Sequence, residues 1–267
     1  MTGKTCSRTG LHLIKADGQT GFRVTQDRYH PLSAMENKYV GPLPTPEPGA
    51  ALVDRRGRYD TVGCTVYAGD SEMCAYAEVL GVFRKKLAAV AAAAESIGWK
   101  VDEYVNKVLE DAKLNGVEPP WAIPAAWQMD RSIHELSLPS KGWWVRIDHR
   151  DTLTALERLT SAAAVQGMAE ELQLLTIGSI TGENRALTTL LAQTLRMQTL
   201  EDGSEPLGIS FESKTLFGRC WAFWDRREDL GLPPGSNDPQ VVTSGGIGTD
   251  PHFAFVADYY RLPRPSR

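Results

Sequence analysis

The sequence predicts an α+β fold, and three observations support that class. Segments rich in β-branched and aromatic residues, the composition of strands, recur along the chain, as at 142–148 and 218–224. Long helix-forming segments also recur, as at 72–96 and 184–196. The expected strands and helices do not alternate regularly, which argues against a doubly wound parallel sheet. Neither an internal repeat nor a low-complexity linker divides the 267 residues, so we expect one domain.

The composition is that of a globular protein and argues against several classes. Hydrophobic residues make up 42% of the chain and charged residues 23%, which is enough apolar material for a large core. The net charge of −4 and the absence of a Lys- or Arg-rich run argue against a general nucleic-acid surface. No apolar window of about 18 residues predicts a membrane span. The four scattered cysteines form no C-x-x-C pair and no zinc pattern, so we expect reduced thiols, no metal site and a cytoplasmic location.

The first 54 residues predict short strands followed by a loop. Residues 1–20 are polar apart from one apolar patch and predict a loose arm or an edge strand. Residues 21–25 predict a strand that contains Arg23. An arginine in a strand is usually a solvated edge residue, and that interpretation is favoured before other observations are added. Residues 29–54 are rich in proline and predict a long loop able to cover a site.

The stretch 55–80 predicts a loop, a strand and the start of a long helix. Its basic, glycine-containing opening at 55–58 is expected to be exposed, and the run 64–68 has the composition of a strand. Ser71 is a good N-cap, and Glu72 suits the positive end of a helix dipole. The helix is then expected to continue to about residue 96.

The rest of the chain predicts further helices and strands, with the tryptophans at 143, 144, 221 and 224 in the core. The expected elements are a helix at 99–114, mixed structure at 121–138, a strand at 142–148, a helix at 151–166, a strand at 172–177, a helix at 184–196, strands at 208–213 and 218–224, a strand from 241, a glycine-rich turn at 245–248, a segment at 253–260 and a disordered tail at 261–267.

Three side chains of the stretch 55–80 are candidates for a site, because they come from neighbouring elements. Arg58 presents a planar donor fork that matches a pyrophosphate. Tyr67 offers a ring for stacking and a free hydroxyl. Glu78, in the second turn of the expected helix, offers charge to stabilise a cation that develops on a sugar. A surface cluster of ion pairs explains the same residues equally well from composition alone.

Four motifs in order resemble the RES domain family, which is named for an Arg, a Glu and a Ser. The resemblance spans roughly residues 21–225. The matching segments are Gly21-Phe22-Arg23-Val24, Arg56-Gly57-Arg58-Tyr59-Asp60, Thr65-Val66-Tyr67-Ala68-Gly69-Asp70-Ser71 with Ala75-Tyr76-Ala77-Glu78-Val79, and Gly208-Ile209-Ser210-Phe211-Glu212-Ser213.

The resemblance implies a fold and an activity. The family includes toxins of toxin–antitoxin pairs that destroy NAD⁺, and its fold is similar to ADP-ribosyltransferases, with a split, bent β core flanked by helices. By resemblance, Arg23 and Arg58 hold the NAD⁺ phosphates, Tyr67 lines the nicotinamide pocket, Glu78 is the key carboxylate, and Ser213 is the family's serine. NAD⁺ is then a substrate, no cofactor is needed, and an acidic antitoxin that covers the site is the expected partner.

Several departures from the family leave alternatives open. This chain carries a segment at 97–142, expected to be a helical insertion, and a C-terminal strand and tail at 226–267. Asp60 stands where the family has Asn, and the helix residue that assists some members falls in the region 184–189. The acceptor is water, inorganic phosphate or a macromolecule, so an ADP-ribosyltransferase and a non-enzymatic interaction protein remain alternatives. The sequence also leaves the oligomeric state open.

Overall fold

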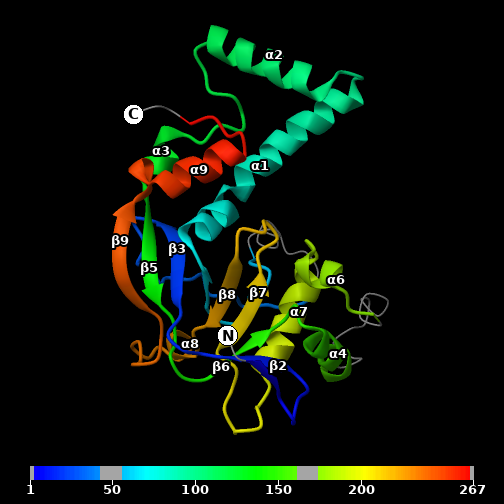
Figure 1. Ribbon diagram of the computed structural model, residues 1–267, viewed down its shortest axis with the longest axis vertical. Helices are drawn as coiled ribbons and strands as arrows, with labels where there is room; N and C mark the ends of the chain where they lie inside the picture. Colours follow the sequence, from blue (N-terminus) through cyan, green and yellow to red (C-terminus); the bar gives the residue numbers. More distant parts are fainter. Residues whose placement is uncertain (1–2, 43–55, 161–173, 265–267) are drawn as a thin grey trace.

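The strands form a single nine-stranded sheet in a computed structural model that describes residues 3–42, 56–160 and 174–264 (Figure 1). Its order is β1-β2-β6-β7-β8-β4-β3-β5-β9, and among these described strands only β6 and β7 pair in parallel. The strands are β1 (Gly3–Thr5), β2 (His12–Lys15), β3 (Thr20–Gln26), β4 (Thr65–Gly69), β5 (Arg131–Ser137), β6 (Trp143–Arg146), β7 (Gly208–Glu212), β8 (Arg219–Trp224) and β9 (Gln240–Gly246). A largely antiparallel sheet with helices outside it confirms the predicted α+β class.

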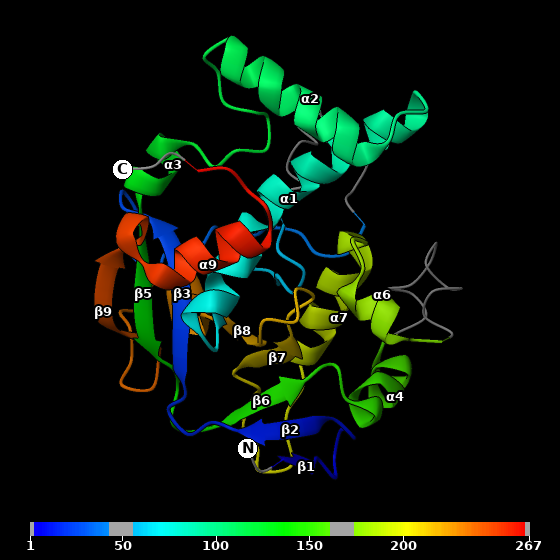
Figure 2. The same ribbon diagram turned by 45° about the horizontal axis from the view of Figure 1, so that its top comes forward.

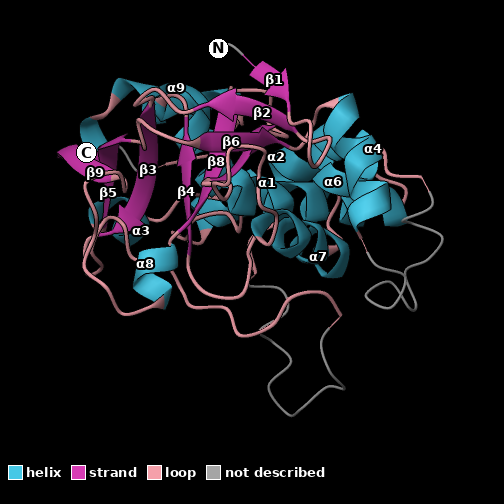
Figure 3. Ribbon diagram, turned by 90° about the horizontal axis from the view of Figure 1, so that it is seen from below, coloured by secondary structure: helices cyan, strands magenta, loops and turns pink. Residues whose placement is uncertain are grey.

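Two groups of helices pack against this sheet (Figure 1), and Figure 3 distinguishes helices from strands by colour. The helical elements are α1 (Glu72–Ser96), α2 (Val101–Leu114), α3 (Ala125–Met129), α4 (Arg150–Leu159), α6 (Ile177–Thr181), α7 (Arg185–Arg196), α8 (Arg226–Asp229), the 3₁₀ turn η3 (Ile247–Thr249) and α9 (Pro251–Tyr259). One group, α4, α6 and α7, packs on β2, β6, β7 and β8, and the other, α1, α3 and α9, packs beside β3 and β5. No helix in the described part of the chain is long and apolar enough to cross a membrane.

The sheet is nearly divided between β3 and β4. These two strands share one register pair, Phe22 with Gly69, whereas β3 and β5 are in register along all of β3. The strands β3, β5 and β9 therefore form one half-sheet, and the other six form the second. Figure 2 shows the two halves running in different directions. We call this boundary the seam.

Successive side chains of a strand point to opposite faces of the sheet, so the larger half-sheet has apolar core on both faces. Val145 and Ala222 face α4 and α7, while their neighbours Trp144 and Trp221 pack on the opposite face. Trp144, Trp221 and Trp224 are buried as predicted. Trp143 is partly exposed, and its indole N–H donates to Asp202 at 2.8 Å.

The helix expected at 72–96 is α1, and its start follows the predicted cap. The Ser71 hydroxyl accepts a hydrogen bond from the backbone N–H of Cys74 at 3.2 Å. One face of the first half of α1 is buried, between Cys74 and Phe83, whereas Glu78 and Val82 in this half are exposed. After Phe83, Ala94 is the one buried residue of α1. The end of α1 and all of α2 therefore project from the sheet as a helical hairpin (Figures 1 and 2).

The expected helical insertion at 97–142 is only partly helical. Its last part is β5, which pairs with β3 on one side and β9 on the other. Polar residues hide this strand from a hydrophobicity pattern: His134 is buried, and its ring nitrogens bond Thr25 at 2.9 Å and Ser244 at 2.8 Å. The mixed structure expected at 121–138 thus contains an internal strand of the sheet.

The prediction of a strand at 172–177 is wrong at 174–177, the part that the structure describes. Thr176 and Ser179 form a capping box that begins α6 at Ile177. Residues 172–173 lie outside the described residues, as do 161–166 of the helix expected at 151–166, 43–54 of the expected loop and 265–267 of the tail.

The N-terminal end of the described chain belongs to the sheet, and α9 lies near its C-terminal end. The tail expected to be disordered from 261 is described to residue 264, and there Leu262 is buried against the core, so the expectation is wrong at that residue. The edge strand expected within 1–20 is β1, and β2 lies between β1 and β6. The turn expected at 245–248 begins two residues later, because β9 continues to Gly246 before η3. The segment 253–260 falls within and just after α9, which begins with Asp250 as its N-cap. The sheet therefore extends on both sides of the range 21–225.

Candidate functional site

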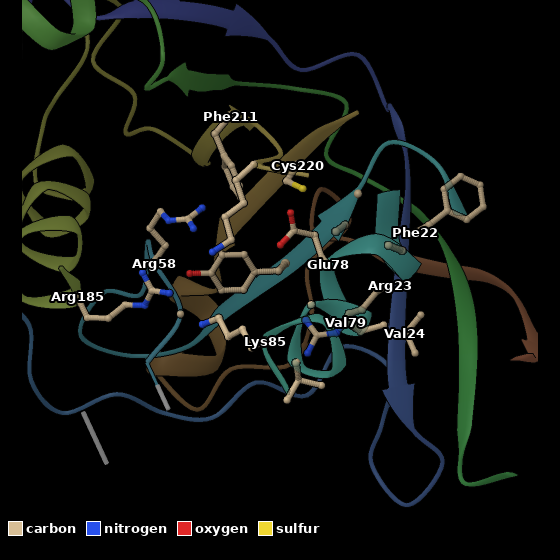
Figure 4. Close-up of a pocket in the computed structure, with 18 residues that line it drawn as sticks. Phe22, Arg23, Val24, Arg58, Glu78, Val79, Lys85, Arg185, Phe211 and Cys220 are labelled. Carbon is tan, nitrogen blue, oxygen red and sulfur yellow. The ribbon is translucent and has the colours of Figure 1, made fainter. Parts of the chain in front are cut away.

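A cavity of about 500 Å³ lies on the seam (Figure 4). Residues from both half-sheets, from α1, from the start of α7 and from the β7–β8 loop contribute to its wall. The lining residues are Phe22, Arg23, Val24, Gly57, Arg58, Tyr67, Ala68, Gly69, Ala75, Glu78, Val79, Gly81, Val82, Lys85, Arg185, Phe211, Lys214 and Cys220. The cavity therefore lies where β3 and β4 share only one register pair.

The cavity brings together four side chains that the sequence singled out. Arg23, Arg58, Tyr67 and Glu78 all line it. Ser213 does not line the cavity, but its hydroxyl donates a hydrogen bond of 2.5 Å to Oε1 of Glu78. Side chains from five separate segments therefore meet at one place.

Glu78 extends from the second turn of α1, and its carboxylate points into the cavity in Figure 4. Ser213, which is fully buried, fixes one carboxylate oxygen. The Ser213 oxygen in turn accepts from the backbone N–H of Thr215 at 3.1 Å. The loop after β7 thereby sets the direction of the carboxylate.

Arg23 lies in β3, which is internal to the sheet, so the interpretation as a solvated edge residue is wrong. Its Nη2 donates to the backbone oxygen of Ser33 at 2.7 Å. Its Nη1 is buried and has no hydrogen-bond partner in the part of the chain that the structure describes. Burial lowers the pKa of Arg23 to about 10. One donor nitrogen of Arg23 is thus anchored to the backbone, and the residue contributes to the cavity wall.

Arg58 is 8% exposed, so the expectation of an exposed basic loop is wrong at this residue. Its Nε has no hydrogen-bond partner within residues 3–42, 56–160 and 174–264. A buried charged donor without a partner is costly. Arg58 also lines the cavity, where a guanidinium suits an anionic ligand. In Figure 4 the guanidinium of Arg58 and the carboxylate of Glu78 enter the cavity from different sides.

The turn that carries Arg58 is organised by Asp60. Its Oδ2 accepts from the backbone N–H of Gly57 at 2.7 Å and from Nδ2 of Asn37 at 3.1 Å. A Cβ on Gly57 would lie 2.6 Å from both the Asp60 carboxylate and the Tyr67 hydroxyl, so only glycine fits. Burial raises the pKa of Asp60, and the hydrogen bonds to its carboxylate oppose that rise.

The Tyr67 hydroxyl is not free, contrary to the expectation. It donates to Oδ1 of Asp60 at 2.9 Å and accepts from the backbone N–H of Tyr59 at 2.9 Å. Burial, together with the nearby Asp60 charge, raises the pKa of Tyr67 well above its ordinary value. Its ring is therefore available to the cavity, while its hydroxyl joins β4 to the Arg58 turn.

Three cations of the cavity wall were not singled out from the sequence: Lys85, Arg185 and Lys214. Lys85 lies seven residues after Glu78, two turns along the same helix face, which is a signal that could have revealed it. Arg185 falls within the region 184–189 in which the assisting helix residue was expected. Lys214 directly follows Ser213.

All four cysteines are buried and unpaired, which agrees with the expected reduced thiols. The sulfur atoms of Cys74 and Cys220 lie 3.6 Å apart. The Cys74 hydrogen bond and burial raise the pKa of Cys220, so it stays a neutral thiol.

Among the residues that the structure describes, two groups of side chains away from the cavity place metal-binding atom types within 4.8 Å of one another. One is His12, His149 and Asp151, and the other is Glu72 with Asp250 and His252. The His12 and His149 rings stack at 3.7 Å between centroids, with planes 18° apart. Lone pairs in two nearly parallel ring planes do not converge on one ion, so this arrangement is a ring stack.

Searches against models of known protein families, against characterised proteins and against solved structures find no match to this chain.

Proposed function

We propose that this protein cleaves the bond between nicotinamide and ribose in NAD⁺. The observation that carries the proposal is that Arg23, Arg58, Tyr67 and Glu78 line one cavity, as the resemblance to the RES domain family requires. The near division of the sheet at that cavity also supports a relation to the split β core of ADP-ribosyltransferases. The cavity volume of about 500 Å³ lies in the range usual for small-molecule sites.

The chemistry needs a carboxylate and a clamp for phosphates. The nicotinamide leaves as a neutral ring, and positive charge builds on the ribose as in an oxocarbenium ion. Glu78 stabilises that charge, and Ser213 holds the carboxylate in position. Arg23 and Arg58, which line the cavity, grip the pyrophosphate and orient the ribose toward Glu78.

The atoms balance with either small acceptor. Water gives nicotinamide, ADP-ribose and a proton, and hydrogen phosphate gives nicotinamide, ADP-ribose 1-phosphate and a proton. The Tyr67 ring, held by its hydroxyl, forms a wall on which a flat ring stacks.

The test is the change Glu78→Gln, which keeps size and removes charge. We expect NAD⁺ loss to fall by about 100-fold or more, because the developing cation loses its counter-charge. Glu95→Gln is the matched control, since Glu95 is exposed near the far end of the same helix. Full activity in a folded Glu78→Gln protein would refute the role.

Identifying the products by mass, with and without phosphate, determines the acceptor. ADP-ribose alone indicates water, and ADP-ribose 1-phosphate indicates phosphate. A macromolecule labelled from labelled NAD⁺ would instead favour an ADP-ribosyltransferase.

A further inference from the structure

The three additional cations of the cavity wall converge on one carboxylate, that of Glu183. Nη2 of Arg185 lies 2.9 Å from its Oε2, and Nζ of Lys85 lies 3.6 Å from the same oxygen. Lys214 forms an ion pair with Oε1. The three cations come from α7, α1 and the β7–β8 loop, which are far apart in the sequence. We call Lys85, Arg185 and Lys214 the cation triad.

The triad carries two more positive charges than Glu183 neutralises. All three cations line the cavity, whereas Glu183 is not part of the lining and its side chain is 56% exposed. The Lys214 hydrogen bond, with the charges of Arg185 and Lys85, lowers the pKa of Glu183 to about 2. Glu183 therefore remains ionised at neutral pH at the rim of the cavity.

Arg185 is held in place without Glu183. Its Nε donates to the backbone oxygen of Arg56 at 3.2 Å, and its Nη1 donates to the backbone oxygen of Gly182 at 3.1 Å. The guanidinium is thus oriented before any ligand arrives, which lowers the entropy lost on binding. Glu183 is 56% exposed in each of its ion pairs, and ion pairs open to solvent contribute little free energy. A phosphate group, with more charge and more acceptor oxygens, is a stronger partner for the same donors.

We propose that the cation triad is a subsite for a phosphate group of the ligand and that Glu183 is a built-in competitor for it. The proposal rests on the proposed function for the identity of the full ligand, NAD⁺. The phosphate chemistry rests on the triad itself. Entry of the phosphate group displaces the Glu183 carboxylate toward solvent, where it is already half exposed. Glu183 thereby tunes affinity and makes it depend on the charge of the ligand.

The test measures binding of inorganic diphosphate and of orthophosphate by calorimetry at low salt, without turnover. We expect Glu183→Gln to bind one or both about 3- to 10-fold more tightly, because a weak competing ion-pair network is removed. Adding Lys214→Met to that variant is expected to abolish the gain. Glu205→Gln is the matched control, since Glu205 is 59% exposed, pairs with Arg226 and lies outside the cavity lining.

Two outcomes overturn the proposal: unchanged affinity for both anions in Glu183→Gln, or an equal gain in Glu205→Gln. Glu183→Ala repeats the measurement without an amide and checks that the result does not depend on glutamine. A failure of the proposed function is distinguishable, because absent NAD⁺ cleavage leaves the anion-binding result unaffected.

Discussion

The Tyr67 hydroxyl gives the sharpest test of how the site is held together. Tyr67→Phe removes one oxygen and leaves the ring in the cavity wall. The lost oxygen accepts from the buried backbone N–H of Tyr59 and donates to Oδ1 of Asp60, both at 2.9 Å. Tyr59 is fully buried and Asp60 is 6% exposed, so water does not readily replace either bond.

The expected cost follows from the groups left without partners. An unsatisfied buried donor or acceptor costs about 1–3 kcal/mol, and two such groups in one network do not add fully. Oδ2 of Asp60 keeps the hydrogen bonds from Gly57 and Asn37, so the turn retains part of its support. We therefore expect Tyr67→Phe to lower the free energy of unfolding by about 2–4 kcal/mol.

Urea denaturation at pH 7, followed by tryptophan fluorescence, measures this loss as a lower midpoint at an unchanged slope. Tyr29→Phe is the control, because Tyr29 is 52% exposed, and it is expected to change stability by no more than about 0.5 kcal/mol. A loss below about 1 kcal/mol for Tyr67→Phe would refute the structural role of the hydroxyl. A large fall in NAD⁺ cleavage at unchanged stability would assign the hydroxyl to the ligand instead.

Three further predictions concern other parts of the molecule. Ser213→Ala releases the Glu78 carboxylate, so kcat for the proposed NAD⁺ cleavage is expected to fall about tenfold with KM unchanged. An unaltered kcat in steady-state kinetics would contradict this. Although burial opposes it, the Arg219 charge holds the pKa of Asp148 below its ordinary 3.8, so Asp148 stabilises the fold above pH 3.8 and this contribution is lost as the pH falls further. Asp148→Asn is accordingly expected to lower the free energy of unfolding by about 2 kcal/mol at pH 7 and by little in strong acid. A difference in denaturation midpoints between the two proteins that does not change with pH would contradict this. The buried cysteines are expected to resist a thiol reagent in the native state and to react together in guanidinium, so rapid native labelling of any one would contradict their burial.

Local signals were sufficient for much of the fold. Ser71 and the helix-forming run after it predicted α1, and dense β-branched and aromatic runs predicted β4, β6, β7 and β8. These elements satisfy both local propensity and burial, so the two signals agree.

The remaining elements depend on tertiary contacts that no local pattern carries. The strand β5 contains the buried His134, whose polarity is compensated only by Thr25 and Ser244 from neighbouring strands. The capping box of Thr176 was overlooked beside an apolar run that suggested a strand. Tertiary hydrogen bonds and cap geometry prevailed over hydrophobicity at both places.

In the candidate site, too, local sequence signals predicted some residues, and tertiary contacts determine the rest. Motif spacing singled out Arg23, Arg58, Tyr67 and Glu78, which the fold places in one cavity. The role of Asp60 in organising the turn was not foreseen, because its hydrogen-bond partners come from three separate segments. The convergence of Lys85, Arg185 and Lys214 on one carboxylate was hidden for the same reason.

The single register pair between β3 and β4 has a mechanical consequence. Arg23 lies in one half-sheet and Tyr67 in the other, so the two half-sheets form different walls of the cavity. A ligand that contacts both residues links the two half-sheets, where few backbone hydrogen bonds join β3 to β4. Ligand binding in the cavity is then expected to stabilise the whole sheet against local opening. Slower hydrogen exchange of the backbone amides of β3 and β4 would show this.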